Sequence, residues 1–193
     1  MNRKYISDII INSIKIKENL LNDKQYINLL IKVSEIVLNS FRNKNKLLLC
    51  GNGGSAADAQ HIAAEFTGRF YFDRDPLFAE ALHANTSYLT AVANDYSFND
   101  IYSRLIKAKA IKGDVLIGIS TSGNSENIIR AFNQAKEQGV TTIAFSGKGG
   151  GKIKNIADYN IIVPSDDTPR IQEIHILIGH IICDLVEKQY FNK

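Results

Sequence analysis

The sequence contains no tryptophan and only one methionine, three prolines and two cysteines among its 193 residues. Cys50 and Cys183 lie too far apart for a metal-binding motif, and both sit in apolar segments. We therefore expect two buried thiols in a reducing cytoplasm. Neither a membrane span nor a signal peptide is predicted, because charged residues interrupt the isoleucine-rich N-terminal segment.

The chain also carries little excess of either positive or negative charge. The formal net charge is only +3, and the basic residues are scattered along the chain instead of clustered. No aromatic platform accompanies them, so we expect lysine and arginine to cover solvated surface and predict neither a nucleic-acid partner nor a membrane partner.

What the sequence does contain is a regular alternation of short apolar runs and amphipathic stretches after residue 46. This pattern predicts a parallel sheet with crossover helices, and the length predicts one domain over residues 1–193. The predicted strands are 46–50, 78–82, 114–119, 141–146 and 159–163. The predicted helices are 55–67, 87–93, 98–110, 125–138 and 168–190, the last with Thr168 as its N-cap and Pro169 in its first turn.

Residues 1–42 precede the first strand and read as two helices. Apolar side chains recur at helical spacing in both, more cleanly in the second. Such stripes pack against either the protein's own core or another copy of the chain, and we hold both open.

The most informative segment follows the strand at 114–119. Four hydroxyl side chains lie within six positions, and Gly123 allows a tight turn before a helix begins; the hydroxyls belong to Ser120, Thr121, Ser122 and Ser125. Unpaired amides at a helix N-terminus, together with hydroxyls, can hold a phosphate without a lysine. The alternative is a serine-rich turn with a good N-cap.

A second turn of this kind follows the first predicted strand. Gly51-Asn52-Gly53-Gly54-Ser55 leads straight into a helix, with Ser55 as its expected cap. Its glycine spacing fits neither a dinucleotide fingerprint nor a Walker loop. Two such turns favour a ligand crevice at the carboxyl ends of parallel strands, although a glycine-rich turn can also serve packing alone.

Two helices carry pairs of chemically capable side chains. His61 and Glu65 are four residues apart and share a face of one helix, while Gln172 and His180 can reach one side of the last helix. A glutamate and a histidine can shuttle protons near neutral pH, or the set can bind a divalent metal. Taken as spacings alone, they fit packed or solvated side chains equally well.

The chain as a whole resembles the phosphoheptose isomerases, also called sedoheptulose 7-phosphate isomerases, of the sugar isomerase (SIS) domain family. The resemblance rests on Gly51–Arg69, Leu89–Asp95, the turn from Ser120 to Ser125, Arg170–His175 and His180. The turns alone would indicate only an SIS domain. The isomerase is indicated by the joint presence of His61, Glu65, Gln172 and His180.

This resemblance implies a three-layer α/β sandwich, flavodoxin-like, around a five-stranded parallel sheet with a helical N-terminal extension. It implies a homotetramer with active sites between subunits. The implied enzyme is a ketose–aldose isomerase that converts D-sedoheptulose 7-phosphate to D-glycero-D-manno-heptose 7-phosphate through a cis-enediol. That reaction is the first step toward ADP- or GDP-heptose for lipopolysaccharide or capsule.

The resemblance also implies roles for individual residues. The implied sugar-phosphate site consists of Asn52, Gly53, Gly54, Ser55, Glu65, Asn94, Asp95, Ser120, Thr121, Ser122, Ser125 and Gln172. The implied ligands of one Zn²⁺ per subunit are His61, Glu65, Gln172 and His180. Glu65 would move the proton between C1 and C2 and His180 the oxygen protons, with the reverse assignment open. Four protein ligands would, however, leave the metal no open position.

Three other polar residues receive structural interpretations. Asp58 is expected to be a solvated helix charge, and His83 and His175 are expected to be packing or hydrogen-bonding histidines. Two competing functions remain: a non-catalytic SIS module that binds a sugar phosphate or a protein, and an isomerase of another phosphorylated ketose.

Overall fold

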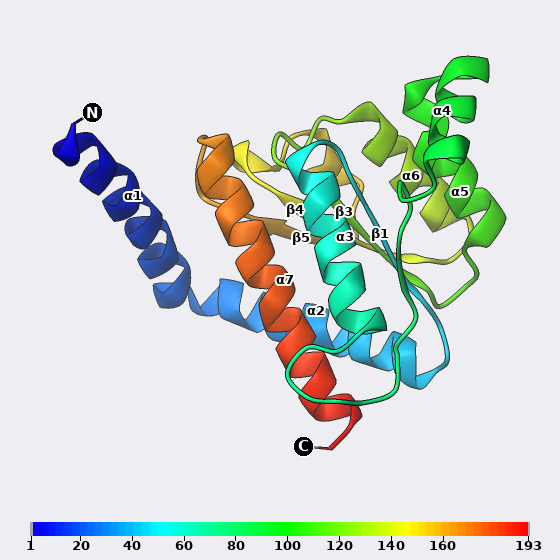
Figure 1. Ribbon diagram of the computed structural model, residues 1–193, viewed down its shortest axis with the longest axis horizontal. Coiled ribbons are helices and arrows are strands. Elements are labelled where there is room, and N and C mark those ends of the chain that lie inside the picture. The colour runs from blue at the N-terminus through cyan, green and yellow to red at the C-terminus, as the bar shows by residue number, and fades with distance from the viewer. Residues whose placement is uncertain (1, 193) are drawn as a thin grey trace.

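The computed structural model describes residues 2–192 and contains one five-stranded sheet (Figure 1). Every pairing in it is parallel, and the strand order is β2-β1-β3-β4-β5. The strands are β1 (Leu47–Gly51), β2 (Ala79–Ala81), β3 (Val115–Ser120), β4 (Thr141–Ser146) and β5 (Tyr159–Ile162). This is the flavodoxin-like order: β2 lies on one side of β1, and the chain then crosses to the other side of β1, where it adds β3, β4 and β5. The predicted sheet is confirmed.

Helices cover both faces of this sheet, as a parallel sheet requires. The helices after β1 are α3 (Gly54–Thr67), α4 (Thr86–Asp95), α5 (Ile101–Lys109), α6 (Glu126–Glu137) and α7 (Thr168–Tyr190). Short 3₁₀ turns cover Phe98–Asp100, Lys148–Gly150 and Lys152–Asn155. One apolar core joins the sheet to α3, α7 and the N-terminal helices, and a second joins its other face to α4, α5 and α6. The three predicted layers are therefore present (Figure 1).

Two helices precede the sheet, α1 (Arg3–Asn22) and α2 (Lys24–Arg42). They are separated at Asp23, whose side chain caps α2 by accepting from the amides of Gln25 and Tyr26 at 2.9 and 3.1 Å. The two helices differ in burial. α2 packs into the core, whereas α1 buries only Ile16 and Leu20 and projects from the body of the molecule (Figure 1).

One exposed side of α1 is apolar, whereas its other exposed positions carry charged and polar side chains. Its exposed large hydrophobic side chains are Tyr5, Ile6, Ile10, Ile11, Ile14 and Leu21. A single exposed leucine is ordinary, but a continuous apolar helix face marks a contact surface. Beside it, α1, α2 and α7 enclose a groove of about 260 Å³ with an almost wholly apolar lining.

Two predicted helix caps are wrong. Ser55 lies inside the first turn of α3, because Gly53, with a φ of 56°, takes the N-cap position and the helix begins one residue earlier. Asp167 instead of Thr168 occupies the N-cap position of α7, without a side-chain hydrogen bond to its amides, and Pro169 stays in the first turn. The predicted helix 98–110 is a 3₁₀ turn followed by α5. None of the helices described has the length and apolarity needed to cross a membrane.

Candidate active site

The two turns singled out in the sequence lie side by side at the carboxyl ends of β1 and β3. These strands are hydrogen-bonded neighbours, and Gly51 pairs with Ile119 just before the turns begin. The Asn52 and Asn127 side chains join the turns with reciprocal amide hydrogen bonds of 3.0 and 2.9 Å. This point is the topological switch of the sheet, where open α/β folds bind their ligands.

Both helices that start at this crevice lack a side-chain cap within residues 2–192. Gly53 precedes α3 and has no side chain to offer, and the hydroxyl of Ser125, which precedes α6, accepts from none of that helix's amides. By contrast, Asn2, Asp23 and Asn85 all cap their helices with side-chain oxygens. Within the described residues, the amides of Gly54 in α3 and of Glu126 and Asn127 in α6 have no backbone acceptor, so they stay available for an anion, which the helix dipole also favours. The next amides of α3, those of Ser55 and Ala56, already donate to the carbonyls of Asn52 and Gly53.

The hydroxyl-rich turn has a defined shape. The Ser120 and Ser125 hydroxyls lie 3.0 Å apart, and the Ser122 hydroxyl accepts from the amide of Asn124 at 3.2 Å. Gly123, with a φ of 63°, packs so closely on Gly150 that a Cβ would collide with the Gly150 carbonyl. The glycine-rich segment after β4 thus supports the turn from behind.

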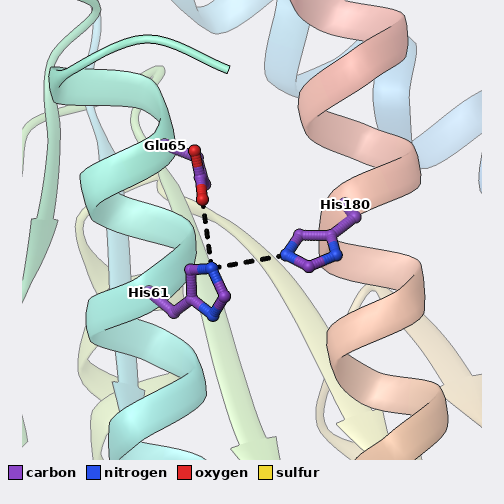
Figure 2. Close-up of side chains that lie close together, drawn as sticks. All are labelled: His61, Glu65 and His180. Atoms are coloured by element: carbon purple, nitrogen blue, oxygen red, sulfur yellow. Dashed lines mark hydrogen bonds and ion pairs between the residues drawn. The ribbon is translucent and has the colours of Figure 1, made fainter. Parts of the chain in front are cut away.

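A second group of side chains gathers between the C-terminal half of α3 and the middle of α7 (Figure 2). His61 Nε2 lies 3.0 Å from Glu65 Oε1 and 3.4 Å from His180 Nε2. The side chains of His61 and Glu65 are 48% and 23% exposed, so the cluster is open to solvent on one side. It brings an imidazole from each helix to one carboxylate, which permits proton transfer or metal binding.

The cluster fits a divalent metal by its donor set. One ligand atom from each of His61, Glu65 and His180 lies within 4.8 Å of the others. Two imidazole nitrogens and one carboxylate oxygen suit zinc, and three protein ligands leave a coordination position for substrate or water. The four ligands predicted from the sequence would have filled every position of a tetrahedral metal. With only these three residues as ligands, one position stays open.

Gln172 stands apart from this cluster in the chain. It lies against Gly54, where a Cβ would come within 2.5 Å of the Gln172 Nε2 atom. His180 is eight residues further along α7, a rise of about 12 Å. The structure brings Gln172 to the turn after β1 and brings the other three predicted ligands together elsewhere.

The remaining predicted site residues lie around the crevice or beyond it. Ser55 is buried and Thr121 half-buried, while Gly53 and Gly54 are exposed. Asn94 and Asp95 occupy the exposed last turn of α4, where the Asn94 amide donates to the Asp95 carboxylate at 2.9 Å.

The prediction that Asp58 is solvated is wrong. Its side chain is partly buried, and Oδ2 has no hydrogen-bond partner among the described residues. Burial raises the pKa of Asp58, although nearby His61 opposes that shift. A helix pattern alone placed Asp58 on the polar face and could not show that this position is partly buried.

The structural interpretations of His175 and the cysteines are confirmed. His175 is fully buried, with Nε2 3.1 Å from the carbonyl oxygen of Ser146, and burial lowers its pKa to about 4. His83 packs its ring edge-on to Tyr102, with the ring centroids 6.3 Å apart. Cys50 and Cys183 are free and buried.

Sequence reasoning missed the residues that support the cluster. Arg74 and Glu187 form a buried ion pair next to it, and Asn127 joins the two crevice turns. A glutamate within the apolar seam of the last helix was the available signal, because a buried acid requires partners.

Comparison with known proteins identifies the class first. Residues 15–147 match the SIS domain model, and the sheet order and crevice described above agree with that class. The chain is 56% identical to the phosphoheptose isomerase of Clostridium acetobutylicum, covering 99% of this chain and 97% of that protein. Phosphoheptose isomerase 2 of Campylobacter jejuni is 51% identical over 98% of this chain and 94% of its own.

Solved structures support the same family assignment. The phosphoheptose isomerase of Neisseria gonorrhoeae superposes with a TM-score of 0.90 at 42% identity, covering 96% of this chain and 98% of that one. The corresponding enzyme of Francisella tularensis gives 0.92 at 33% identity, with 97% and 100% covered. The protein belongs to the phosphoheptose isomerase family, whose members are sugar-phosphate isomerases.

Proposed function

We propose that the protein, a single SIS domain over residues 1–193, converts D-sedoheptulose 7-phosphate to D-glycero-D-manno-heptose 7-phosphate. The observation that supports this proposal is the close contact of His61, Glu65 and His180, from two helices, in a chain that also has the anion crevice. A non-catalytic module would need the crevice but not this cluster. The product would enter nucleotide-activated heptose synthesis for surface glycans.

The phosphate would bind at the crevice. The hydroxyls of the turn after β3 and the first-turn amides of α6 supply hydrogen-bond donors, and both helix N-termini attract negative charge. The turn of residues 52–55 would close the other side of the sugar phosphate. Asn94, Asp95 and Gln172 would contact sugar hydroxyls.

The reaction moves one proton between adjacent carbons. Glu65 would remove a proton from C1 of the open-chain ketose, which leaves a cis-enediol, and would return that proton to C2 to give the aldose. His180 would move the proton between O1 and O2 and assist ring opening. Geometry permits the reverse assignment, since both groups face the same space (Figure 2).

We propose Zn²⁺ as the metal held by His61, Glu65 and His180, one per chain. When bound, it would polarise the substrate oxygens on which negative charge develops. Gln172 would join this set only from a second copy, since its own chain holds it beside Gly54.

We also propose that each active site is shared between copies of the chain. Ser55 and Glu65 are ten residues apart on α3, a rise of about 15 Å, which exceeds the reach of an extended heptose phosphate. A cluster from one copy facing a crevice from another removes this difficulty. The apolar face of α1 supplies a contact surface for such a tetramer. A cytoplasmic location is supported by the two free cysteines.

The activity test is direct. Purified protein is incubated with sedoheptulose 7-phosphate, and formation of the aldose is followed by chromatography. We expect turnover, with less on fructose 6-phosphate. Tight sugar-phosphate binding without turnover would instead support the non-catalytic module, and equal rates on both ketoses would contradict the assigned substrate.

Shared sites are tested by mixing two inactive variants. Glu65→Gln removes the base, and Ser122→Asp places a negative charge in the anion turn. Unfolding and refolding the two together should restore about a quarter of wild-type activity, because random assembly unites an intact cluster with an intact crevice at that frequency. Sites contained in one chain would leave the mixture inactive.

A further inference from the structure

Arg74 and Glu187 form a buried ion pair beside the His61–Glu65–His180 cluster. Arg74 Nε lies 3.0 Å from Glu187 Oε1, and the two side chains are only 2% and 1% exposed. Arg74 belongs to the segment between α3 and β2, which passes around the C-terminal half of α7 (Figure 1). A buried ion pair is weak evidence for stability, because removing both charges from water offsets their attraction.

Arg74 completes the end of the helix that carries Glu65. Its Nη2 donates to the Glu65 carbonyl oxygen at 2.7 Å, and Nη1 donates to the carbonyl oxygens of Phe66 and Gly68 at 2.6 and 2.8 Å. Carbonyls in the last turn of a helix lack amide partners, and the helix dipole favours a cation there. The guanidinium therefore fixes the last turn of α3, with Glu65 in it.

Glu187 binds the chain segment that follows α3. Besides Arg74, it accepts from the amides of Phe70 and Tyr71 at 2.9 and 2.8 Å. Burial alone would raise the pKa of Glu187, but these amides and the guanidinium outweigh burial and hold the pKa below its ordinary value. The carboxylate stays charged and keeps the segment after α3 attached to α7.

The same contacts reach His180. Glu187 lies two turns after His180 on one face of α7, and the Phe70 ring, whose amide Glu187 binds, lies 5.7 Å from the His180 ring. One ion pair thus links the backbone of Glu65 to the ring that packs on His180. Glu65 and His180 come from different helices (Figure 2), so their separation depends on how α3 and α7 are joined.

We propose that Arg74 and Glu187 are positioning residues that set the distance between Glu65 and His180 for the isomerisation. This inference rests on the proposed function for the roles of those two side chains. Both side chains are buried, so neither is placed to touch substrate. Their effect would be on the geometry of proton transfer, and binding of the phosphate at the crevice would not depend on them.

The test compares Arg74→Met with Arg74→Lys and with a matched control, Arg42→Met. Arg42 also joins α7, by donating to the Gln189 carbonyl oxygen at 3.0 Å, but within residues 2–192 its side chain makes no hydrogen bond or ion pair to α3 or to the cluster. We expect Arg74→Met to lower kcat about 10- to 100-fold, as loss of an orienting partner does. KM and the dissociation constant for inorganic phosphate should change less than about threefold. Arg74→Lys should recover part of kcat.

A second readout reports geometry without turnover. The chain has four histidines, so protein labelled with ¹³C-histidine gives four imidazole signals. Arg74→Met should move the signals of His61 and His180 and leave those of His83 and His175 in place. Should Arg74→Met not fold, Glu187→Gln replaces it in both measurements, because the amide keeps the size and an acceptor oxygen.

Wild-type kcat per folded molecule, with all four histidine signals unmoved, would overturn the proposal and leave the ion pair a purely structural contact. Parallel losses in Arg42→Met would overturn it as well. The proposed function fails separately: turnover that survives Glu65→Gln would reject the catalytic assignment, while the histidine signals would still show whether Arg74 positions the cluster.

Discussion

The Nε2 atoms of His61 and His180 lie 3.4 Å apart, although 119 residues separate the two histidines in the chain. Their rings meet edge-to-face, with centroids 5.0 Å apart. Two N–H groups cannot point at each other across this distance, so the facing nitrogens accommodate one hydrogen or one metal ion between them. The pair is therefore suited to passing a proton or holding a cation, and Glu65 completes it.

Replacing Glu65 by glutamine should preserve the fold and lower kcat about 100- to 10,000-fold, the contribution of a positioned base. The amide keeps the side chain's size and its contact to His61 but cannot take a proton. Turnover of sedoheptulose 7-phosphate and circular dichroism measure the two effects. Glu137→Gln, in the last turn of α6, is the matched control and should match wild type. An active Glu65→Gln enzyme would remove Glu65 from the mechanism.

Zinc should bind once per chain at the cluster. Protein stripped with a chelator should take up one equivalent of Zn²⁺ in a calorimetric titration, and His61→Ala should weaken this binding more than about 100-fold, beyond what loss of an outer-shell partner does. The control, His83→Gln, also removes one histidine, as His61→Ala does, and should bind zinc normally. Equal zinc binding by His61→Ala and wild type would move the metal to another site.

The sequence alone predicted the elements of the crevice but not how the cluster is supported. Both turns follow strands whose apolar runs are unambiguous, so Ser120 and Gly53 could be assigned to one edge of a sheet. The ring contact of His61 with His180 depends on α3 and α7 packing in parallel, and no spacing along the chain contains that information. The same holds for Gln172, whose position beside Gly54 separates it from the ligands it was grouped with.

Partial burial of Asp58 shows a related limit. Helical periodicity assigns a face, but it does not show how far the rest of the fold buries that face. Arg74 and Glu187 escaped notice for this reason too, because a charged pair 113 residues apart is invisible until the segment after α3 folds around α7.

Gly123→Ala should weaken phosphate binding. A Cβ there would meet the Gly150 carbonyl at a φ already unfavourable for alanine, so the turn must move away from the segment behind it. Losing one hydrogen bond to a charged phosphate raises the dissociation constant about 10- to 100-fold. Titration with inorganic phosphate and with substrate measures this change.

Gly149→Ala is the matched control for that experiment. Gly149 also has a positive φ, 73°, but a Cβ there meets nothing within 4 Å among the described residues. It should cost about 1 kcal/mol of stability for the backbone conformation alone and leave phosphate affinity unchanged. Equal losses of affinity in both variants would show that backbone strain, and not the contact between Gly123 and Gly150, controls the turn.

His175 should make the protein less stable as the pH falls from 6.5 toward 4. Burial holds its folded pKa at about 4 against 6.5 when exposed, so unfolding takes up a proton in that window. The stability lost is on the order of 3 kcal/mol, with no further contribution from this residue below pH 4. Denaturant unfolding of wild type and His175→Phe across this range measures the difference. The phenylalanine variant gives up the hydrogen bond to the Ser146 carbonyl at every pH, which shifts its curve uniformly, but it should lack this part of the slope. Parallel curves between pH 6.5 and 4 would mean that His175 is protonated in the folded protein and that its burial is incomplete.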